Sequence, residues 1–242
     1  MPLSRVLFVS DLHLAGERPD TTARFRRFFR EVVPGATALY ILGDLFEAWP
    51  GDDALGLPFE SEVAAILRAA SADRPLFFLH GNRDFIAGES FARATGATML
   101  PDPSVIDLHG RRAVLLHGDT LCTDDVAYQA FRAQVRDPAW QAAILARPLA
   151  ERIALTRGLR AGSQAAKQTK TEAIMDVNDG AVARAFADAA CDLMIHGHTH
   201  RPARHEHVVD GRRCERWVLP DWYESGGYLA ATPGGLEAVP LA

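Results

Sequence analysis

Aspartate, histidine and asparagine recur in five short polar clusters, and each cluster directly follows an apolar run. The clusters are Asp11-Leu12-His13, Gly43-Asp44, Gly81-Asn82-Arg83-Asp84, His117-Gly118-Asp119 and Gly197-His198-Thr199-His200. Short apolar runs bounded by glycine and polar residues are typical of buried strands, and loops at strand ends carry the chemistry of open α/β folds. Carboxylate and amide oxygens with imidazole nitrogens, and no thiolate, are ligands for Mn²⁺, Fe²⁺ or Zn²⁺.

Taken together and in this order, the clusters predict a hydrolase with two metal ions. Such a site needs about four ligands on each ion, one of them shared, with open positions for water and substrate. Asp44 is the expected bridge, because a carboxylate has an oxygen for each ion. Asp11, His13 and His200 are expected to complete the shell of one ion, and Asn82, His117 and His198 that of the other. Two divalent cations outweigh two aspartates, so the site would attract phosphate.

The elements that must position these clusters fall into two kinds. Strands at 5–10, 38–42 and 76–80 alternate with helices that begin at Asp20 or lie near 59–72 and 90–95, which predicts a mostly parallel sheet. Later runs at 204–209, 213–219 and 228–232, with the turn pair Asp210-Gly211, are typical of antiparallel hairpins. Two sheets packed together inside helices would accommodate both halves of the chain.

A long helical stretch follows the fourth cluster, and we expect about 124–172 to be a cap inserted within one domain, 1–242. Asp124 and Asp137 are the expected helix caps. Apolar residues crowd the segment 140–159, and the only two lysines of the chain, Lys167 and Lys170, follow it three residues apart. An apolar pocket with a cationic rim fits a lipid that bears phosphate. The alternative is a pair of helices that simply covers the sheet.

Composition limits the partners and the location. The net charge of -5 and pI near 6.0 argue against binding to nucleic acid backbones. Three cysteines at no metal-binding spacing suit a reducing compartment, so we expect a cytoplasmic protein. No uncharged apolar stretch approaches the ~18 residues that a membrane span needs. Of the carboxylates and histidines beside the ligands, Asp84 and Asp119 are expected to orient ligating histidines.

The ordered pattern Asp-x-His, Gly-Asp, Gly-Asn-x-Asp, His and Gly-His-x-His resembles that of the calcineurin-like metallophosphoesterases. The resemblance implies an α/β fold, a four-layer αββα sandwich of two mixed sheets with an inserted helical cap. Arg83 departs from the pattern, because many relatives have there the histidine that protonates the leaving group. Arginine keeps its proton near neutral pH, but its fork can hold two phosphate oxygens. We expect Arg83 and His198 to be the catalytic residues.

Longer stretches resemble one branch of that family, which hydrolyses the pyrophosphate bond of UDP-2,3-diacylglucosamine to UMP and 2,3-diacylglucosamine 1-phosphate in lipid A biosynthesis. They are Gly-Asn-Arg-Asp at 81–84 and the segments 117–125, 173–178 and 195–202. The resemblance implies two Mn²⁺ ions per chain, acyl chains held by the helical insert, and peripheral binding to the cytoplasmic face of the inner membrane. It assigns substrate contacts to Asn82, Arg83, Asp125, Ser163, Lys167, Lys170 and His198.

Two other functions fit the same metal pattern. A generic metal-dependent phosphodiesterase or nuclease would use the same ions, but the acidic net charge and the apolar insert count against it. A scaffold of the same fold without catalysis would be expected to lose ligands, whereas all seven positions are filled here. We therefore expect a hydrolase that acts on a glycolipid and not on nucleic acid.

Overall fold

The first sheet of the computed structural model has six strands in the order β11-β10-β1-β2-β3-β4, and the structure describes residues 4–169 and 174–241. The strands are β1 (Val6–Val9), β2 (Ala38–Ile41), β3 (Leu76–Leu79), β4 (Thr98–Leu100), β10 (Gly227–Thr232) and β11 (Gly235–Pro240). Strands β1 to β4 are parallel, while β10 runs antiparallel to β1 and β11 antiparallel to β10. The predicted alternation of strands and helices thus builds a mostly parallel arrangement.

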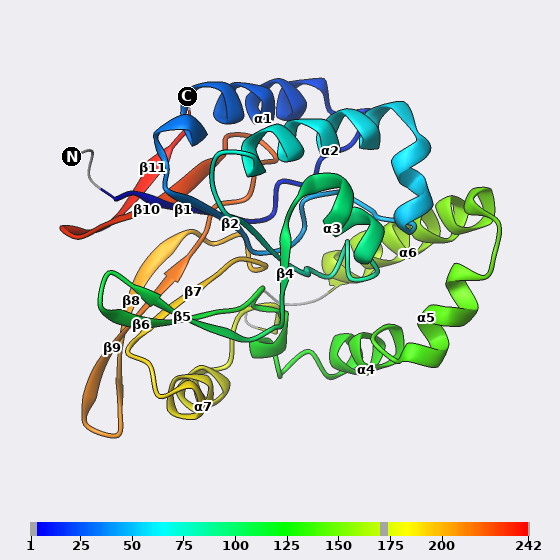
Figure 1. Ribbon diagram of the computed structural model, residues 1–242. Helices are drawn as coiled ribbons and strands as arrows, with labels where there is room; N and C mark the ends of the chain where they lie inside the picture. The colour runs from blue at the N-terminus through cyan, green and yellow to red at the C-terminus, as the bar shows by residue number, and fades with distance from the viewer. Residues whose placement is uncertain (1–3, 170–173, 242) are drawn as a thin grey trace.

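Three helices cover the outer face of this sheet (Figure 1). They are α1 (Pro19–Glu31), α2 (Pro58–Ser71) and α3 (Glu89–Thr95), with short 3-10 turns at Val33–Gly35 and Asp52–Gly56. The expected capping role of Asp20 was wrong: Pro19 opens α1, Arg18 stands at the N-cap, and Asp20 lies in the first turn. Helix α3, expected near 90–95, ends at Gly96, whose φ of 71° is the left-handed conformation that closes many helices.

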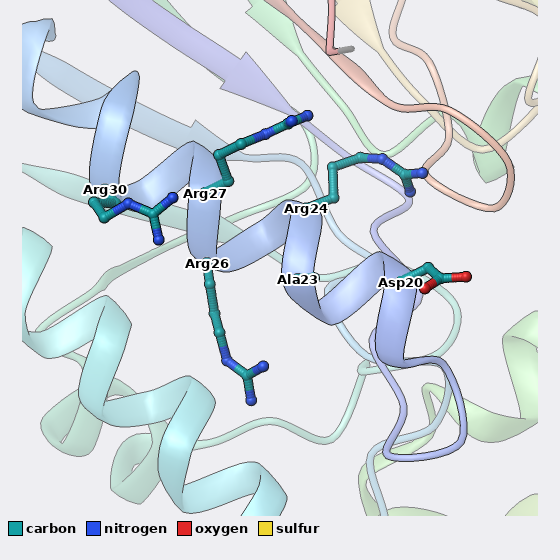
Figure 2. Close-up of a pocket in the computed structure, with 6 residues that line it drawn as sticks. All are labelled: Asp20, Ala23, Arg24, Arg26, Arg27 and Arg30. Atoms are coloured by element: carbon teal, nitrogen blue, oxygen red, sulfur yellow. The ribbon is translucent and has the colours of Figure 1, made fainter.

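Arginines on the outer face of α1 tie this helix to its neighbours. Figure 2 shows Arg26 extending toward α2, where its guanidinium makes two hydrogen bonds to Glu62, with N···O distances of 2.6 and 2.9 Å. Arg24 points the other way and donates to the carbonyls of Trp222 and Glu224. The inner face of the same helix carries buried phenylalanines, so α1 packs on the sheet through apolar contacts and is braced at its rim by charged ones.

The second sheet has five strands in the order β5-β6-β7-β9-β8. They are β5 (Ser104–Leu108), β6 (Arg111–Leu115), β7 (Leu193–His196), β8 (Ala203–Val209) and β9 (Arg212–Val218), and α7 (Asp179–Ala189) covers this sheet from outside (Figure 1). Strands β6, β7 and β9 are parallel, and the outer pairs are antiparallel. Strands β8 and β9 form the predicted hairpin, with positive φ at Asp210 and Gly211.

Alternate side chains of the inner strands enter different apolar layers. In β1, Leu7 faces the helices α1 to α3 and Phe8 faces the second sheet, and both are fully buried. In β6, Leu115 joins the layer between the sheets, while Val114 packs with Phe186 of α7. Three apolar interfaces therefore separate four layers, which confirms the predicted sandwich of two mixed sheets between helices.

Three further helices lie together beyond the ends of the strands, at the right of Figure 1. They are α4 (Val126–Val135), α5 (Pro138–Leu145) and α6 (Leu149–Thr169). Asp137 caps α5 as predicted, but α4 is capped by Asp125, which accepts from the Tyr128 N–H, because Asp124 is instead paired with the Asn178 side chain. Within the described ranges, no helix is both long and apolar enough to cross a bilayer.

Candidate active site

Seven predicted ligands converge at one end of the two sheets. Each follows the carboxyl end of a strand: Asp11 and His13 follow β1, Asp44 follows β2, Asn82 follows β3, His117 follows β6, and His198 and His200 follow β7. Strands β1 to β3 are parallel neighbours in one sheet, and β6 and β7 are parallel neighbours in the other. Their ends therefore meet where the two sheets face each other, which brings together side chains that are far apart in the sequence.

One half of the cluster joins Asp11, His13 and His200. His13 Nε2 lies 3.3 Å from His200 Nε2 and 3.8 Å from Asp11 Oδ1, and His200 Nε2 lies 3.3 Å from the same Asp11 oxygen. These three ligand atoms all lie within 4.8 Å of one another. The three side chains can therefore contact one cation at the same time.

The other half centres on the Asn82 amide oxygen. His117 Nε2 lies 3.0 Å from Asn82 Oδ1, and His198 Nδ1 lies 2.9 Å from it. Asp44 stands between the halves, with Oδ2 at 3.8 Å from His13 Nε2 and Oδ1 at 3.8 Å from His117 Nε2. Each carboxylate oxygen of Asp44 thus faces a different half, which is the arrangement that a shared ligand requires.

The backbone at five of these positions adopts the left-handed conformation. The φ angles are 55° at Asp11, 49° at His13, 53° at Asp44, 67° at His198 and 55° at His200. Few residues other than glycine adopt this conformation, although aspartate and histidine do so more often than most. Such residues gather at functional sites, where the surrounding structure holds the strain.

Close packing around Asp44 fixes its position. Asp84 accepts hydrogen bonds from the N–H groups of Gly81 (2.8 Å) and Leu45 (2.7 Å), so it braces the loops after β2 and β3. A Cβ at Gly81 would overlap the backbone and carboxylate of Asp44, so only glycine fits there. Asp84, which was expected to orient a ligating histidine, thus holds backbone groups instead, and Leu42 O lies 2.9 Å from His117 Nδ1 and orients that ring.

The electrostatics of the cluster favour positive charge. Burial works against an ionised His117, but the carboxylates of Asp44, Asp11 and Asp119 outweigh it and raise the pKa of His117 to about 9. Burial raises the pKa of Asp44 to about 7. The negative potential therefore draws protons or cations, and two carboxylates, an amide oxygen and four imidazoles are a suitable donor set for divalent ions.

Comparison with known proteins agrees with this geometry. Residues 4–202 match the family described as calcineurin-like phosphoesterase. The chain belongs to that family. Binding of divalent metal by an Asp/His cluster is a property of the family, and the clustered side chains of this phosphoesterase are of that kind.

Two relatives match almost the whole chain. A protein of Stenotrophomonas maltophilia (strain K279a) is 50% identical over 243 residues, covering 98% of each chain. One of Aromatoleum aromaticum is 54% identical over 224 residues, covering 92% of this chain and 91% of its own. Both are named UDP-2,3-diacylglucosamine hydrolase. Among solved structures, Vacuolar Protein Sorting 29 from Cryptosporidium parvum matches with a TM-score of 0.50 and covers 99% of this chain and 97% of its own. At 13% sequence identity, this match shows a likeness of fold alone.

A cavity of about 570 Å³ opens onto the ligand cluster of this phosphoesterase. Arg83 and Asp125 line it together with Asn82 and His198, while apolar side chains of α4 to α6 form the opposite wall. Cys122 also lines the cavity, and burial raises the pKa of its thiol to about 12. Ser163 and Lys167 belong to α6, and their side chains are outside the described part; Lys170 lies wholly outside the described residues.

Several residues at the site were not predicted from the sequence. Tyr128 Oη donates to Asp119 Oδ2 (2.8 Å), and the Tyr128 ring lies 5.6 Å from that of His198. Glu47, Arg160 and Tyr223 surround the outer side of His13. A partial signal was available for Glu47, since it stands three residues after Asp44 among apolar neighbours. No sequence pattern links it to Arg160 or Tyr223.

Proposed function

We propose that this phosphoesterase hydrolyses the pyrophosphate bond of UDP-2,3-diacylglucosamine to UMP and 2,3-diacylglucosamine 1-phosphate, a step of lipid A biosynthesis. The observation that carries the proposal is the combination of two features in one cavity. Its floor is the convergent cluster of Asp, His and Asn ligands, and its opposite wall is apolar. A generic phosphodiesterase needs only the floor, whereas a diacylated substrate needs both. The names of the relatives at about half identity support the same substrate.

The ligand cluster is proposed to hold two Mn²⁺ ions that share Asp44. Asp11, His13 and His200 would bind one ion with Asp44, and Asn82, His117 and His198 would bind the other with Asp44. When bound, such ions supply Lewis-acid chemistry, activating water for attack and withdrawing charge from phosphate oxygens. The protein supplies fixed positions for all seven side chains, through the loops that follow parallel strands.

Arg83 and His198 are the proposed catalytic residues. The Arg83 N–H donates to Asp44 Oδ1 (2.8 Å), which anchors the residue beside the cluster, and its side chain lines the cavity. A guanidinium holds phosphate oxygens and balances charge that grows in the transition state, but it gives up no proton at neutral pH. That chemistry suits a phosphate leaving group, which needs little protonation. His198 adds an imidazole that contacts Asn82 on the same wall.

Residues 124–172 are proposed to be a cap inserted in a single domain, 1–242, that receives the acyl chains. Phe131, Trp140, Ile144, Leu155 and Leu159 supply its apolar lining. The polar contacts are assigned to Asn82, Arg83, Asp125, Ser163, Lys167, Lys170 and His198. A substrate with two acyl chains resides in a membrane, so we further propose a cytoplasmic protein bound peripherally to the inner membrane.

The test is turnover of UDP-2,3-diacylglucosamine in detergent with Mn²⁺, measured as UMP, beside the same substrate without acyl chains. We expect the acylated substrate to be hydrolysed with a much higher kcat/KM. Trp140→Ala should reduce that preference, because Trp140 is part of the apolar wall. Asp73→Asn, at an exposed site remote from the cavity, is the matched control. Equal turnover of the two substrates, or comparable rates on bis(p-nitrophenyl) phosphate, would refute the proposed substrate.

A further inference from the structure

Glu47 stands behind His13, on the side away from the other ligands. Its side chain is only 3% exposed. The two nitrogens of His13 face different partners, since Nε2 lies 3.8 Å from Asp44 Oδ2 and Nδ1 lies 3.7 Å from Glu47 Oε2. The second separation is longer than a hydrogen bond, so Glu47 acts on the ring through its charge. Negative charge there favours a proton on Nδ1, which leaves the Nε2 lone pair for the ligand cluster.

Two side chains hold Glu47 and the His13 ring in this relation. The Tyr223 ring stacks on the His13 ring at 4.6 Å with 11° between the planes, and Tyr223 Oη donates to Glu47 Oε2 (3.1 Å). The Arg18 guanidinium lies 4.3 Å from the centre of the Tyr223 ring and 3.7 Å from Glu47 Oε2. Rotation of either the carboxylate or the imidazole would break these contacts.

The backbone of Glu47 is fixed to the loop that carries His13. Leu14 donates to Leu45 O (2.9 Å), and the Glu47 N–H donates to Leu14 O (3.0 Å). Leu14 and Phe46 form a β-bridge between the same two loops. The backbone of Glu47 therefore keeps its place relative to His13, and the position of the carboxylate depends on its partners from other parts of the chain.

The partner from the helical segment is Arg160 of α6. Arg160 Nε lies 2.9 Å from Glu47 Oε1, on the carboxylate oxygen that faces away from His13. Glu47 is buried, while Arg160 is 30% exposed and lines the cavity, so the pair joins α6 to the interior of the site. Removing Arg160 would leave this buried carboxylate with Tyr223 and the more distant Arg18 as partners, and losing the nearest partner of a buried charge is costly. Glu47 is thus one contact through which α6 reaches a candidate metal ligand.

We propose that Glu47 is a positioning residue that couples the seating of α6 to metal binding by His13. With Arg160 in place, Glu47 Oε1 pairs with the guanidinium and Oε2 accepts from Tyr223, so the carboxylate is held beside the imidazole of His13. Cation binding by His13 and docking of α6 then favour each other, and linkage makes the effect reciprocal. The inference rests on the proposed metal site and deepens it, because it makes the helical segment a determinant of metal affinity as well as a wall for substrate.

The test is Mn²⁺ binding to metal-stripped protein, measured by isothermal titration calorimetry without substrate. Glu47→Gln should weaken one of two Mn²⁺ sites about tenfold, as removal of groups behind ligating histidines does. Arg160→Met should weaken the same site, and the double variant should bind no more weakly than Glu47→Gln alone. Arg157→Met is the matched control, because Arg157 is exposed on the same helix and does not line the cavity. It should bind like the wild type.

The outcomes separate the coupling from the metal site itself. A wild-type protein that binds no Mn²⁺ refutes the proposed function and the coupling with it. A wild type that binds two ions while Arg160→Met keeps full affinity at both refutes the coupling alone, and so do losses that add in the double variant. If Glu47→Gln fails to fold, Arg160→Met still decides the question, because it replaces a side chain that is 30% exposed.

Discussion

Asp102→Asn is expected to stabilise the protein at neutral pH but much less in acid. Asp102 lies in the connection from β4 to β5, between the two sheets, and its side chain is 7% exposed. Neither carboxylate oxygen accepts a hydrogen bond from the residues that the structure describes, and Arg132 Nη2 is 3.9 Å from Oδ2. Burial, with the charge of Asp119, raises the pKa of Asp102 to about 6. The ionised form is therefore disfavoured in the folded state.

The size of the effect follows from that pKa. The ordinary value is 3.8, and each pH unit of displacement corresponds to about 1.4 kcal/mol. Because the folded pKa is raised, the folded state binds more protons between pH 3.8 and about 6, and stability is lost as pH rises through that window. Above it, ionised Asp102 costs about 3 kcal/mol, which a neutral amide of the same shape removes.

The assay is urea unfolding of both proteins in EDTA at pH 4.5 and pH 8. The gain in unfolding free energy should grow from about 1 kcal/mol at pH 4.5 to about 3 kcal/mol at pH 8, apart from an offset that does not depend on pH. Asp73→Asn serves as the control, because that side chain is 76% exposed. An equal gain at the two pH values, or a smaller gain at pH 8, would show that Asp102 carries no buried charge.

Three further predictions concern the active site. Gly81→Ala should abolish stoichiometric Mn²⁺ uptake, because a Cβ at this position overlaps Asp44. Uptake is measured by mass spectrometry of the bound metal. Gly56→Ala is the control and should keep full uptake, because a Cβ at Gly56 meets no other atom. Arg83→Gln should lower kcat/KM about 100-fold or more while Mn²⁺ content is retained, so loss of metal would contradict its assignment to the transition state. The protein with Mn²⁺ at about 100 times its Kd should melt at a temperature roughly 5–10 °C higher, per bound ion, than the protein in EDTA. Equal melting temperatures in the two solutions would contradict metal binding.

The ligand cluster was predictable because its signal is local. An apolar run followed by Gly-Asp or Asp-x-His marks a strand end, and parallel strands bring their carboxyl ends to the same edge. That reasoning places Asp44 beside Asp11, because they follow neighbouring strands of one sheet. His117 follows a strand of the other sheet, and its place 3.8 Å from Asp44 was predicted from the ordered two-metal pattern. Two sheets inside helices were predicted from strand periodicity and the alternation of strands with helices, and the resemblance to the family supplied the four-layer arrangement.

The contacts behind the ligands were not predictable, because they depend on how distant segments pack. Glu47, Tyr223 and Arg160 come from three separate parts of the chain and meet only when the sheet, the C-terminal loop and α6 are assembled. The predicted cap at Asp124 was wrong for a related reason. Asp124 and Asp125 are equally good caps by residue type, and the contact of Asp124 with Asn178 leaves Asp125 to cap α4.

The left-handed backbone at Asp11 and His13 is held in place by the neighbouring loop. Asp11 and His13 both face the cluster, while Leu12 between them is fully buried in the apolar core. This conformation costs on the order of 1 kcal/mol at each non-glycine residue. Hydrogen bonds from Asp11 N to Gly43 O (3.0 Å) and from His13 N to Asp44 O (2.9 Å) hold it, so the loop after β1 is locked to the loop after β2. The two hydrogen bonds therefore both offset the strain of this backbone and fix the distance between the ligands that follow β1 and Asp44, which follows β2.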